Sequence, residues 1–262
     1  MVDNAKYWND RAHKYGHTGW SNEIVYHFDQ KVRIETLKKL IIENTKDLKN
    51  SSILDFGGGD GTVAKAIAPL VNRYYYYDLS SEIMKIAKER LKDCGNIVYY
   101  QSFEELSKSN NKFDVIIVIT VFQHILDNDD LKNTLIDLRA KLNEKGKLFI
   151  LEDTFSNKEE ITNYIHFRSI NTFENILIQS GFSIEKTIGF YHPFSKSTTE
   201  FNRYYHSFPI MLYKAARKIS HSKASHIINF DRLVNKYIGN IKNYIFEPNV
   251  KDTSRFYLCT KA

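Results

Sequence analysis

The chain has 262 residues, of which 42% are hydrophobic and 26% charged, a composition typical of a globular protein with one sizeable core. Its formal net charge of +6 is concentrated in residues 195–251, which hold ten basic side chains against three acidic ones. No apolar run is long enough to span a membrane, the first residues are polar rather than signal-like, and two cysteines are too few for a disulfide scaffold or a zinc site. We therefore expect a cytoplasmic protein without a metal site.

The N-terminal residues 7–20 are rich in aromatic and histidine side chains but lack a long helical stripe. This pattern predicts a short helix followed by a loop. Apolar residues then recur at helical spacing from Ile24 to Ile42, which predicts a long helix leading into the first strand.

The motif ILDFGGGDG at residues 53–61 is the strongest signal in the chain. An apolar, strand-like run contains Asp55 near its end, three glycines follow at Gly57, Gly58 and Gly59, and a helical pattern begins soon afterwards. Glycine permits positive φ angles and close approach of a ligand to the backbone, while the free N–H groups at a helix start favour an electron-rich ligand. The motif therefore predicts a nucleotide-type binding loop.

The spacing of the glycines decides which nucleotide is expected. A dinucleotide fingerprint would place its last small residue at Thr62, and a phosphate loop would need a lysine after Gly61, so neither fits. The acid-x-G-x-G-x-G arrangement that begins at Asp55 resembles motif I of the class I S-adenosylmethionine-dependent methyltransferases. The resemblance implies an α/β, Rossmann-like fold with a seven-stranded, mostly parallel sheet, helices on both faces and an antiparallel last strand. It also implies S-adenosyl-L-methionine as cofactor, held by Asp55 and the loop 57–59, and S-adenosyl-L-homocysteine as product.

An acidic residue at the end of the second predicted strand supports this interpretation. Residues 71–78 form a β-rich run that ends at Asp78, 23 positions after Asp55. An acid at this point of a βαβ unit can accept hydrogen bonds from a ribose diol. In the resembled family the matching acid binds the adenosine ribose, so we expect Asp78 and the adjacent Leu79 to contact the nucleoside.

The adenine contact departs from the family pattern. After the third predicted strand, at 96–100, the family commonly has an aspartate that accepts the adenine amino group, whereas this chain has Ser102. We expect adenine to be held by the Ser102 hydroxyl, by backbone groups and by packing against Phe103.

The fourth predicted strand leads to the expected reaction centre. Residues 113–119 are a nearly continuous β-branched run, typical of a strand buried on both faces of a parallel sheet, and TVFQH follows at 120–124. Ligands of open α/β sheets bind beyond the carboxyl ends of the strands. The segment resembles the loop of small-molecule methyltransferases rather than the [DN]-P-P-[YFW] motif of nucleic-acid enzymes, which places Thr120 at the cofactor. His124 is the first candidate for a catalytic base and substrate contact, and its alternative is a structural histidine.

The YWxxRAxxYG pattern that begins at Tyr7 resembles the N-terminal lid that many small-molecule methyltransferases fold over the cofactor. On that resemblance, Tyr7 and Arg11 contact the methionine carboxylate, while Tyr15 and His17 face the acceptor. His17 is then a second candidate base. The alternative is that these side chains only pack the segment onto the body of the protein.

Two further groups of acidic residues are candidates for weaker roles. The aspartates at 127, 129 and 130 open a predicted helix, where they favour its N-terminal dipole, and a magnesium site there is a weak alternative. Residues 143–147 are predicted to form a turn before the fifth strand, at 148–151, and Glu152 and Asp153 follow that strand, so either acid could reach substrate or cap a loop.

The C-terminal part departs from the minimal pattern. The sixth strand is predicted at 183–191, which places Tyr191 and His192 near the acceptor, and the last strand is predicted at 254–260. A hairpin between them would need only about 2–5 residues. We therefore predict that residues 194–252 are a helical cap inserted over the acceptor site, with one of its helices at 208–219.

Taken in order, the chain is expected to form a helical lid at 1–45, a methyltransferase core at 46–193 and 253–262, and the inserted cap. The expected reaction moves a methyl group to an oxygen or nitrogen of a small or medium-sized metabolite, such as a natural product, a glycan or an anionic precursor. The basic cap leaves RNA or other nucleic-acid methylation open, and a catalytically silent cofactor-binding interaction protein is a third interpretation. Covalent methylation of a pyrimidine carbon is disfavoured, since neither Cys94 nor Cys259 is placed as a nucleophile.

Overall fold

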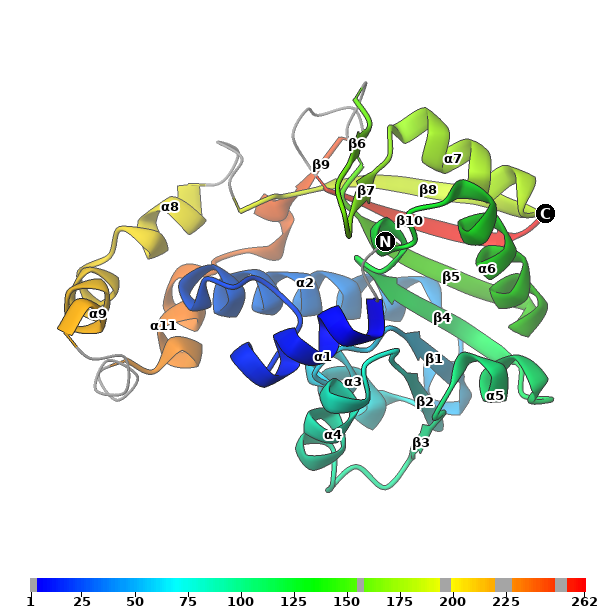
Figure 1. The fold of residues 1–262 in the computed structure, drawn as a ribbon, viewed down its shortest axis with the longest axis horizontal. Coiled ribbons are helices and arrows are strands. Elements are labelled where there is room, and N and C mark those ends of the chain that lie inside the picture. The colour runs from blue at the N-terminus through cyan, green and yellow to red at the C-terminus, as the bar shows by residue number, and fades with distance from the viewer. Residues whose placement is uncertain (1–3, 155–157, 194–198, 220–227, 248–253) are drawn as a thin grey trace.

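The computed structural model describes residues 4–154, 158–193, 199–219, 228–247 and 254–262. Its centre is an eight-stranded sheet with strand order β3-β2-β1-β4-β5-β10-β8-β9 and helices on both faces (Figure 1). The strands of this sheet are β1 (Ser52–Phe56), β2 (Arg73–Tyr77), β3 (Ile97–Tyr99), β4 (Phe113–Ile119), β5 (Leu142–Glu152), β8 (Phe182–Phe190), β9 (Ile245–Phe246) and β10 (Ser254–Lys261). A separate two-stranded sheet consists of β6 (Glu160–Ile161) and β7 (His166–Phe167).

The strand directions confirm the predicted fold class. Strands β3, β2, β1, β4 and β5 run parallel, and β10 lies antiparallel between β5 and β8. The eighth strand, β9, was not predicted, because a strand of two residues carries no periodicity. It pairs with the end of β8, where a Cβ on Gly189 would lie 2.5 Å from the carbonyl oxygen of Glu247.

The helices lie on both faces of this sheet. Helices α2, α3 and α4 lie on one side, and α5, α6 and α7 lie on the other (Figure 1). The described helices are α1 (Asn4–Tyr15), α2 (Glu23–Asn44), α3 (Thr62–Ile67), α4 (Ser81–Arg90), α5 (Phe103–Lys108), α6 (Asn128–Lys141), α7 (Ile170–Gln179), α8 (Thr199–Tyr205), α9 (Phe208–Ile219) and α11 (Phe230–Tyr237). Side-chain caps fix several of their starts: Ser80, Asp127 and Ser169 accept backbone N–H groups in the first turns of α4, α6 and α7.

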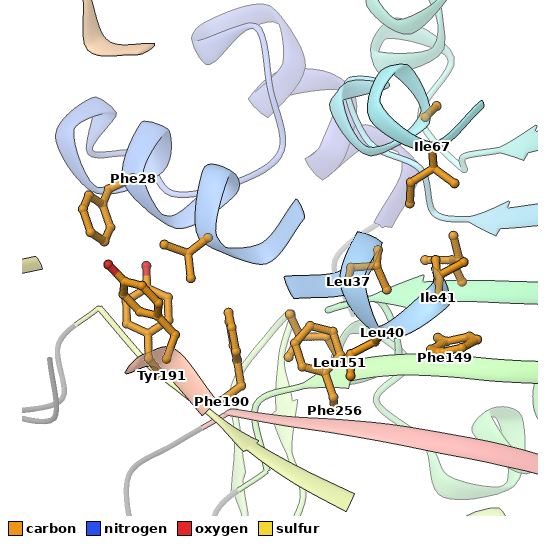
Figure 2. Packing of buried hydrophobic residues seen from close by; sticks show 14 of the residues in the cluster. Phe28, Leu37, Leu40, Ile41, Ile67, Phe149, Leu151, Phe190, Tyr191 and Phe256 are labelled. Atoms are coloured by element: carbon orange, nitrogen blue, oxygen red, sulfur yellow. The ribbon is translucent and has the colours of Figure 1, made fainter. Parts of the chain in front are cut away.

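The hydrophobic core lies in two layers, one on each face of the sheet. In the first layer Phe28 and Leu37 of α2 pack in one cluster with Phe149 and Leu151 of β5 and Phe256 of β10 (Figure 2). The second layer packs α5, α6 and α7 against the opposite face. The central strands are buried on both sides, which explains their nearly continuous apolar sequences and fixes the positions of the loops that follow them.

The described helices of the insertion pack along the N-terminal half of α2 and extend beyond the end of the sheet (Figure 1). The Tyr204 hydroxyl of α8 donates to the carbonyl oxygen of Ile24 at 3.0 Å, and the ring of Phe230 in α11 stacks on His27 with 4.5 Å between centroids. No helix in the described ranges combines the length and the apolar composition that a membrane span requires.

Candidate functional site

A cavity of about 660 Å³ opens at the carboxyl ends of β1, β2 and β4. Its walls come from these strand ends, from α1, the loop 17–21 and α2, and from residues within 164–167. The charged side chains in the wall are the carboxyls of five aspartates and the guanidinium groups of two arginines, namely Asp29, Asp55, Asp60, Asp78, Asp153, Arg11 and Arg33. The cavity is therefore predominantly acidic and suits a ligand with positive charge.

The backbone of the glycine loop forms part of the cavity wall. Gly57 and Gly59 have φ angles of 77° and 62°, which side chains rarely adopt. Gly58 has no such φ angle, but a Cβ there would lie 2.3 Å from the ring of Tyr76 and 2.9 Å from Oδ2 of Asp55. All three glycines line the cavity and leave a cradle without side chains.

Two buried acids, Asp55 and Asp78, stand beside this loop. Asp55 accepts a hydrogen bond from the Tyr74 hydroxyl at 2.8 Å, and burial raises the pKa of its carboxyl to about 7. Asp78 accepts the backbone N–H groups of Gly59 and Ser80, each at 2.9 Å, and burial raises its pKa to about 6. A carboxylate offers about four acceptor positions, so Asp78 retains capacity for hydroxyl groups of a ligand.

Helix α1 brings Tyr7 and Arg11 into the cavity wall. Nη2 of Arg11 donates to the carbonyl oxygen of Gly19, whereas its Nε is buried and has no partner among the described residues. A buried donor without a partner costs free energy, so Arg11 is suited to an anionic group of a ligand. The ring of Tyr7 stacks on Tyr164 with 4.8 Å between centroids, which ties α1 to the segment before β7.

His17 lies on the glycine-loop side of the cavity. Its ring stacks on Tyr26 with 3.6 Å between centroids, and the Tyr26 hydroxyl donates to Asp60 of the glycine loop at 2.6 Å. Burial lowers the pKa of His17 to about 4, so the ring is neutral at pH 7. Its Nδ1 is buried and has no partner within the described ranges. His17 therefore lines the cavity beside the glycine loop, and its contact with the acceptor stays a prediction.

The end of β4 carries Thr120 and His124, and both line the cavity. Thr120 has a φ of 51°, a strained conformation for a β-branched residue that is found mostly at functional sites. Nδ1 of His124 lies 2.9 Å from the carbonyl oxygen of Tyr164. Because a carbonyl only accepts, this contact places the proton on Nδ1 and leaves the lone pair on Nε2. Burial lowers the pKa of His124, so the ring is neutral at pH 7 and Nε2 can accept a proton.

Neighbouring side chains fix the orientation of His124. The ring of Trp8 packs edge-on against it with 4.6 Å between centroids, and Nδ2 of Asn4 donates to its carbonyl oxygen at 3.3 Å. Nε2 of Gln123 lies 3.4 Å from Nε2 of His124, a long contact that a stronger donor can replace. Helix α1 therefore contributes to the His124 environment, a role that the sequence did not indicate.

Of the two adjacent acids at the end of β5, Glu152 and Asp153, only Asp153 lines the cavity. Glu152 is buried beneath the 122–124 turn and accepts the N–H groups of Phe122 at 2.7 Å and Gln123 at 3.3 Å. Burial, followed by the charge of Asp153, raises the pKa of Glu152 to about 8. Glu152 therefore positions the turn that carries His124.

A polar cluster on α2 forms another part of the wall and was missed by the sequence analysis. Nε of Arg33 lies 2.6 Å from Oδ2 of Asp29, which also accepts from Nε1 of Trp20 at 2.8 Å. Asp29, Arg33 and Trp20 all line the cavity, together with Asp153. The available signal was the i, i+4 pair of opposite charges within the apolar face of a predicted helix, since a charged residue in that position needs a partner or a ligand.

Two residues near the expected cofactor and acceptor sites lie outside the cavity wall. Ser102 is exposed and caps α5 by accepting the N–H of Glu105 at 3.0 Å, and the adenine contact expected of its hydroxyl stays a prediction. Phe103 and Leu79 do line the cavity. Tyr15 stands behind the wall, with its ring 5.1 Å from the guanidinium carbon of Arg11.

Tyr191 and His192 also lie away from the cavity wall. Tyr191 is fully buried in the core, and its hydroxyl donates to Oδ1 of Asp29 at 3.1 Å, so it supports a cavity residue rather than lining the cavity itself. The ring of His192 packs edge-on against Trp20 with 5.5 Å between centroids. The sequence placed both correctly at the end of β8 but could not show which neighbours separate them from the cavity.

The described part of the insertion, residues 199–219 and 228–247, contributes no residue to the cavity wall. Its expected position over the acceptor site is therefore not observed for these residues. Within the described ranges no group of three or more histidine, cysteine or acidic side chains is arranged to hold a metal ion, and Asp127 is engaged as the cap of α6.

Residues 54–148 match a family model described as a methyltransferase domain. The chain is 23% identical over 206 residues to a ubiquinone biosynthesis O-methyltransferase of Rickettsia canadensis, covering 72% of this chain and 87% of that protein. It is similar to the structure of the N-methyltransferase NodS of Bradyrhizobium japonicum in complex with S-adenosyl-L-homocysteine (TM-score 0.55, 16% identity, 71% and 90% covered). It is also similar to magnesium protoporphyrin IX methyltransferase of Synechocystis with bound S-adenosylmethionine (TM-score 0.58, 13% identity, 100% and 99% covered). At these sequence identities the two comparisons show that the fold is similar.

Proposed function

Since this chain belongs to the class I S-adenosylmethionine-dependent methyltransferases, we propose that it methylates an oxygen or nitrogen atom of a small or medium-sized metabolite. An oxygen acceptor is favoured, because a hydroxyl needs a base and the cavity wall holds a neutral histidine with its lone pair on Nε2. The similarity to an O-methyltransferase of ubiquinone biosynthesis supports the same choice. The hypothesis of a nucleic-acid acceptor depended on the basic insertion, and the described residues of the insertion lie outside the cavity wall.

The residues of the cavity fit S-adenosylmethionine as the donor. Asp78 has acceptor capacity for the ribose hydroxyls, Leu79 and Phe103 offer apolar contacts for adenine, and the unpaired Nε of Arg11 can donate to the methionine carboxylate. The excess of carboxylates in the wall suits the positive sulfonium. When bound, the cofactor supplies an electrophilic methyl group.

His124 is the proposed general base. Methyl transfer is an in-line displacement that positioning and exclusion of water can accelerate. Nε2 of His124 would accept the proton of the acceptor hydroxyl as its oxygen becomes the nucleophile. The Nδ1–H contact to the carbonyl oxygen of Tyr164 would then stabilise the imidazolium. For an amine acceptor the same nitrogen would orient the attacking group.

The acceptor is proposed to lie between His124 and the polar cluster on α2. Arg33 makes its ion pair through Nε, and its two Nη atoms make no hydrogen bond within the described part of the chain. They are therefore suited to donate hydrogen bonds to an oxygen atom of a polar substituent, while the Asp153 carboxylate is suited to accept from a donor group. In this proposal the α1 helix and the loop 17–21 serve as the lid.

The single observation that carries the proposal is the placement of a neutral, oriented His124 in the same cavity as the glycine loop. The test uses labelled S-adenosylmethionine with a panel of phenols, aliphatic alcohols and amines. We expect His124→Ala to lower turnover by about a hundredfold or more. The cofactor affinity of this variant, measured by calorimetry, should equal that of the wild type. The matched control is His206→Ala, which alters an exposed histidine outside the cavity wall.

Two outcomes contradict the proposal. A parallel loss of cofactor binding in His124→Ala would assign the histidine to the cofactor rather than to catalysis. Cofactor binding without methyl transfer to any acceptor, combined with binding of a defined protein, would favour the silent interaction protein.

A further inference from the structure

Helix α9 (Phe208–Ile219) carries a stripe of exposed apolar side chains that the proposed function does not use. Phe208, Met211, Leu212 and Ile219 are 70%, 58%, 46% and 88% exposed, and Ala215 between them is exposed as well. Positions spaced by three or four residues share one face of a helix. Single exposed apolar residues are ordinary, but a continuous stripe marks an interaction surface.

The rest of the fold holds this stripe outward. The opposite face of α9 buries Ile210 and Tyr213 completely. The Tyr213 hydroxyl donates to the Glu23 carboxylate, and its ring packs edge-on against Phe230 with 5.1 Å between centroids. Figure 1 shows α9 at the end of the molecule farthest from α6 and α7. The stripe therefore lies on a well-anchored helix at an extremity of the protein.

Cations accompany the apolar stripe. Helix α9 contains Lys214, Arg217 and Lys218 and no acidic residue. Nζ of Lys214 donates to the carbonyl oxygen of Tyr205 and lies 3.4 Å from the centroid of the Tyr205 ring. These two contacts hold the charge of Lys214 next to Tyr205. Arg203 of the preceding helix α8 is also exposed. The surface thus combines apolar side chains with positive charge.

We propose that α9 docks this enzyme onto an anionic lipid surface. An amphipathic helix of this composition lies in the plane of the membrane interface, with its apolar face among the acyl chains and its cations at the head groups. A second copy of the chain fits less well, because a symmetric contact would bring two sets of cations together. A nucleic acid would satisfy the cations and leave the apolar stripe in water.

The proposal is independent of the acceptor and is tested by co-sedimentation of the full chain with vesicles. We expect binding to vesicles of phosphatidylcholine mixed with phosphatidylglycerol, weaker binding to phosphatidylcholine alone, and release as salt is raised. The triple variant Phe208→Gln, Met211→Gln, Ile219→Gln should bind the mixed vesicles about a hundredfold more weakly. Lys218→Gln should weaken binding to the mixed vesicles by about fivefold and leave binding to phosphatidylcholine alone unchanged.

The matched control is the double variant Ile136→Gln, Ile178→Gln, which removes exposed apolar side chains, 44% and 58% exposed, from α6 and α7 on the other side of the sheet. It should bind vesicles like the wild type. Thermal unfolding and cofactor affinity verify that every variant is folded. Wild-type protein that binds neither vesicle, or a triple variant that binds like the wild type, would overturn the proposal. The proposal would also be overturned if the wild type formed a dimer or bound RNA instead of binding vesicles, and if the triple substitution abolished that association.

Discussion

Among single residues, Gly58 offers a direct test of the glycine loop. Its φ angle is one that other residues adopt, so its requirement is steric: a Cβ would lie 2.3 Å from the ring of Tyr76, which is fully buried in the core. We expect Gly58→Ala to weaken S-adenosylmethionine binding by at least about tenfold and to lower the unfolding free energy by about 1–3 kcal/mol. Calorimetric titration and thermal unfolding measure the two effects.

Gly95→Ala is the matched control for this substitution. No heavy atom lies within 4 Å of a Cβ built on Gly95, and its φ angle is not positive. It should therefore bind the cofactor and unfold like the wild type. Wild-type affinity in Gly58→Ala would show that the cradle next to Tyr76 is not the cofactor site.

The sequence predicted some residues of the site and gave no indication of others. The motifs led to Asp55, Asp78 and His124, because each lies at or after the end of a predicted strand in the family pattern. They gave no sign that Nε of Arg11 and Nδ1 of His17 would be buried without a partner among the residues that the structure describes. Whether a polar atom is satisfied depends on neighbours from distant segments, and a single sequence does not specify them.

At the scale of elements, Glu152 at the end of β5 supports the turn that carries His124. Its carboxyl accepts the N–H groups of Phe122 and Gln123. We expect Glu152→Ala to leave these buried donors without an acceptor and to lower the unfolding free energy by about 2–4 kcal/mol. Turnover should fall because His124 loses its fixed position, while cofactor affinity changes little. Thermal unfolding and steady-state kinetics measure these changes.

Glu144→Ala is the matched control on the same strand. The Glu144 side chain is 91% exposed and pairs with Lys261 at the surface, where an ion pair contributes little to stability. Its removal should leave both unfolding and turnover near the wild-type values. If Glu152→Ala behaves in the same way, the turn at 122–124 does not depend on Glu152.

Elements with a strong period were predicted well, and short or irregular ones were not. The sequence placed β4 at 113–119 and α9 at 208–219, as the structure has them. The five residues 143–147 were expected to form a turn, but they lie within β5, where the pairing register with β4 shifts between Phe113 and Val115. A register shift depends on the neighbouring strand, so local turn chemistry alone suggested the wrong structure.

For the fold as a whole, the sequence indicated where the insertion lies along the chain but not where it lies in space. The described insertion helices pack on α2 through contacts such as the Tyr204 hydroxyl with Ile24, which are 180 positions apart. The expectation of a cap over the acceptor came from the order of strands alone. Distant pairings of this kind are decided by tertiary packing, which leaves no local pattern in the sequence.

The buried acids at the carboxyl ends of the strands also determine how the free energy of unfolding depends on pH. Burial raises the pKa of Asp78 to about 6, of Asp55 to about 7 and of Glu152 to about 8, whereas unfolded carboxyls titrate near pH 4. Below about pH 6.5 this excess of protons is opposed by His17 and His124, whose lowered pKa values keep them neutral in the folded state, so the folded state holds more protons than the unfolded state mainly between about pH 6.5 and pH 8. We expect the unfolding free energy of the cofactor-free protein to fall as pH rises through this window. Denaturant unfolding measured across it should show a smaller slope for Glu152→Gln, and an equal slope would contradict the assignment.

Cofactor binding should show the opposite dependence on pH. The sulfonium is positive, so it interacts more favourably with Asp55 and Asp78 when they are ionised, and binding lowers their pKa values. We expect the affinity for S-adenosylmethionine to rise between about pH 5 and pH 7 with release of protons, which calorimetry in buffers of different ionisation enthalpy measures. The range ends below about pH 7.5, because the amino group of the cofactor itself begins to titrate there. Asp55→Asn should flatten the rise, and an affinity that falls across this range would show that these carboxyls do not face the sulfonium.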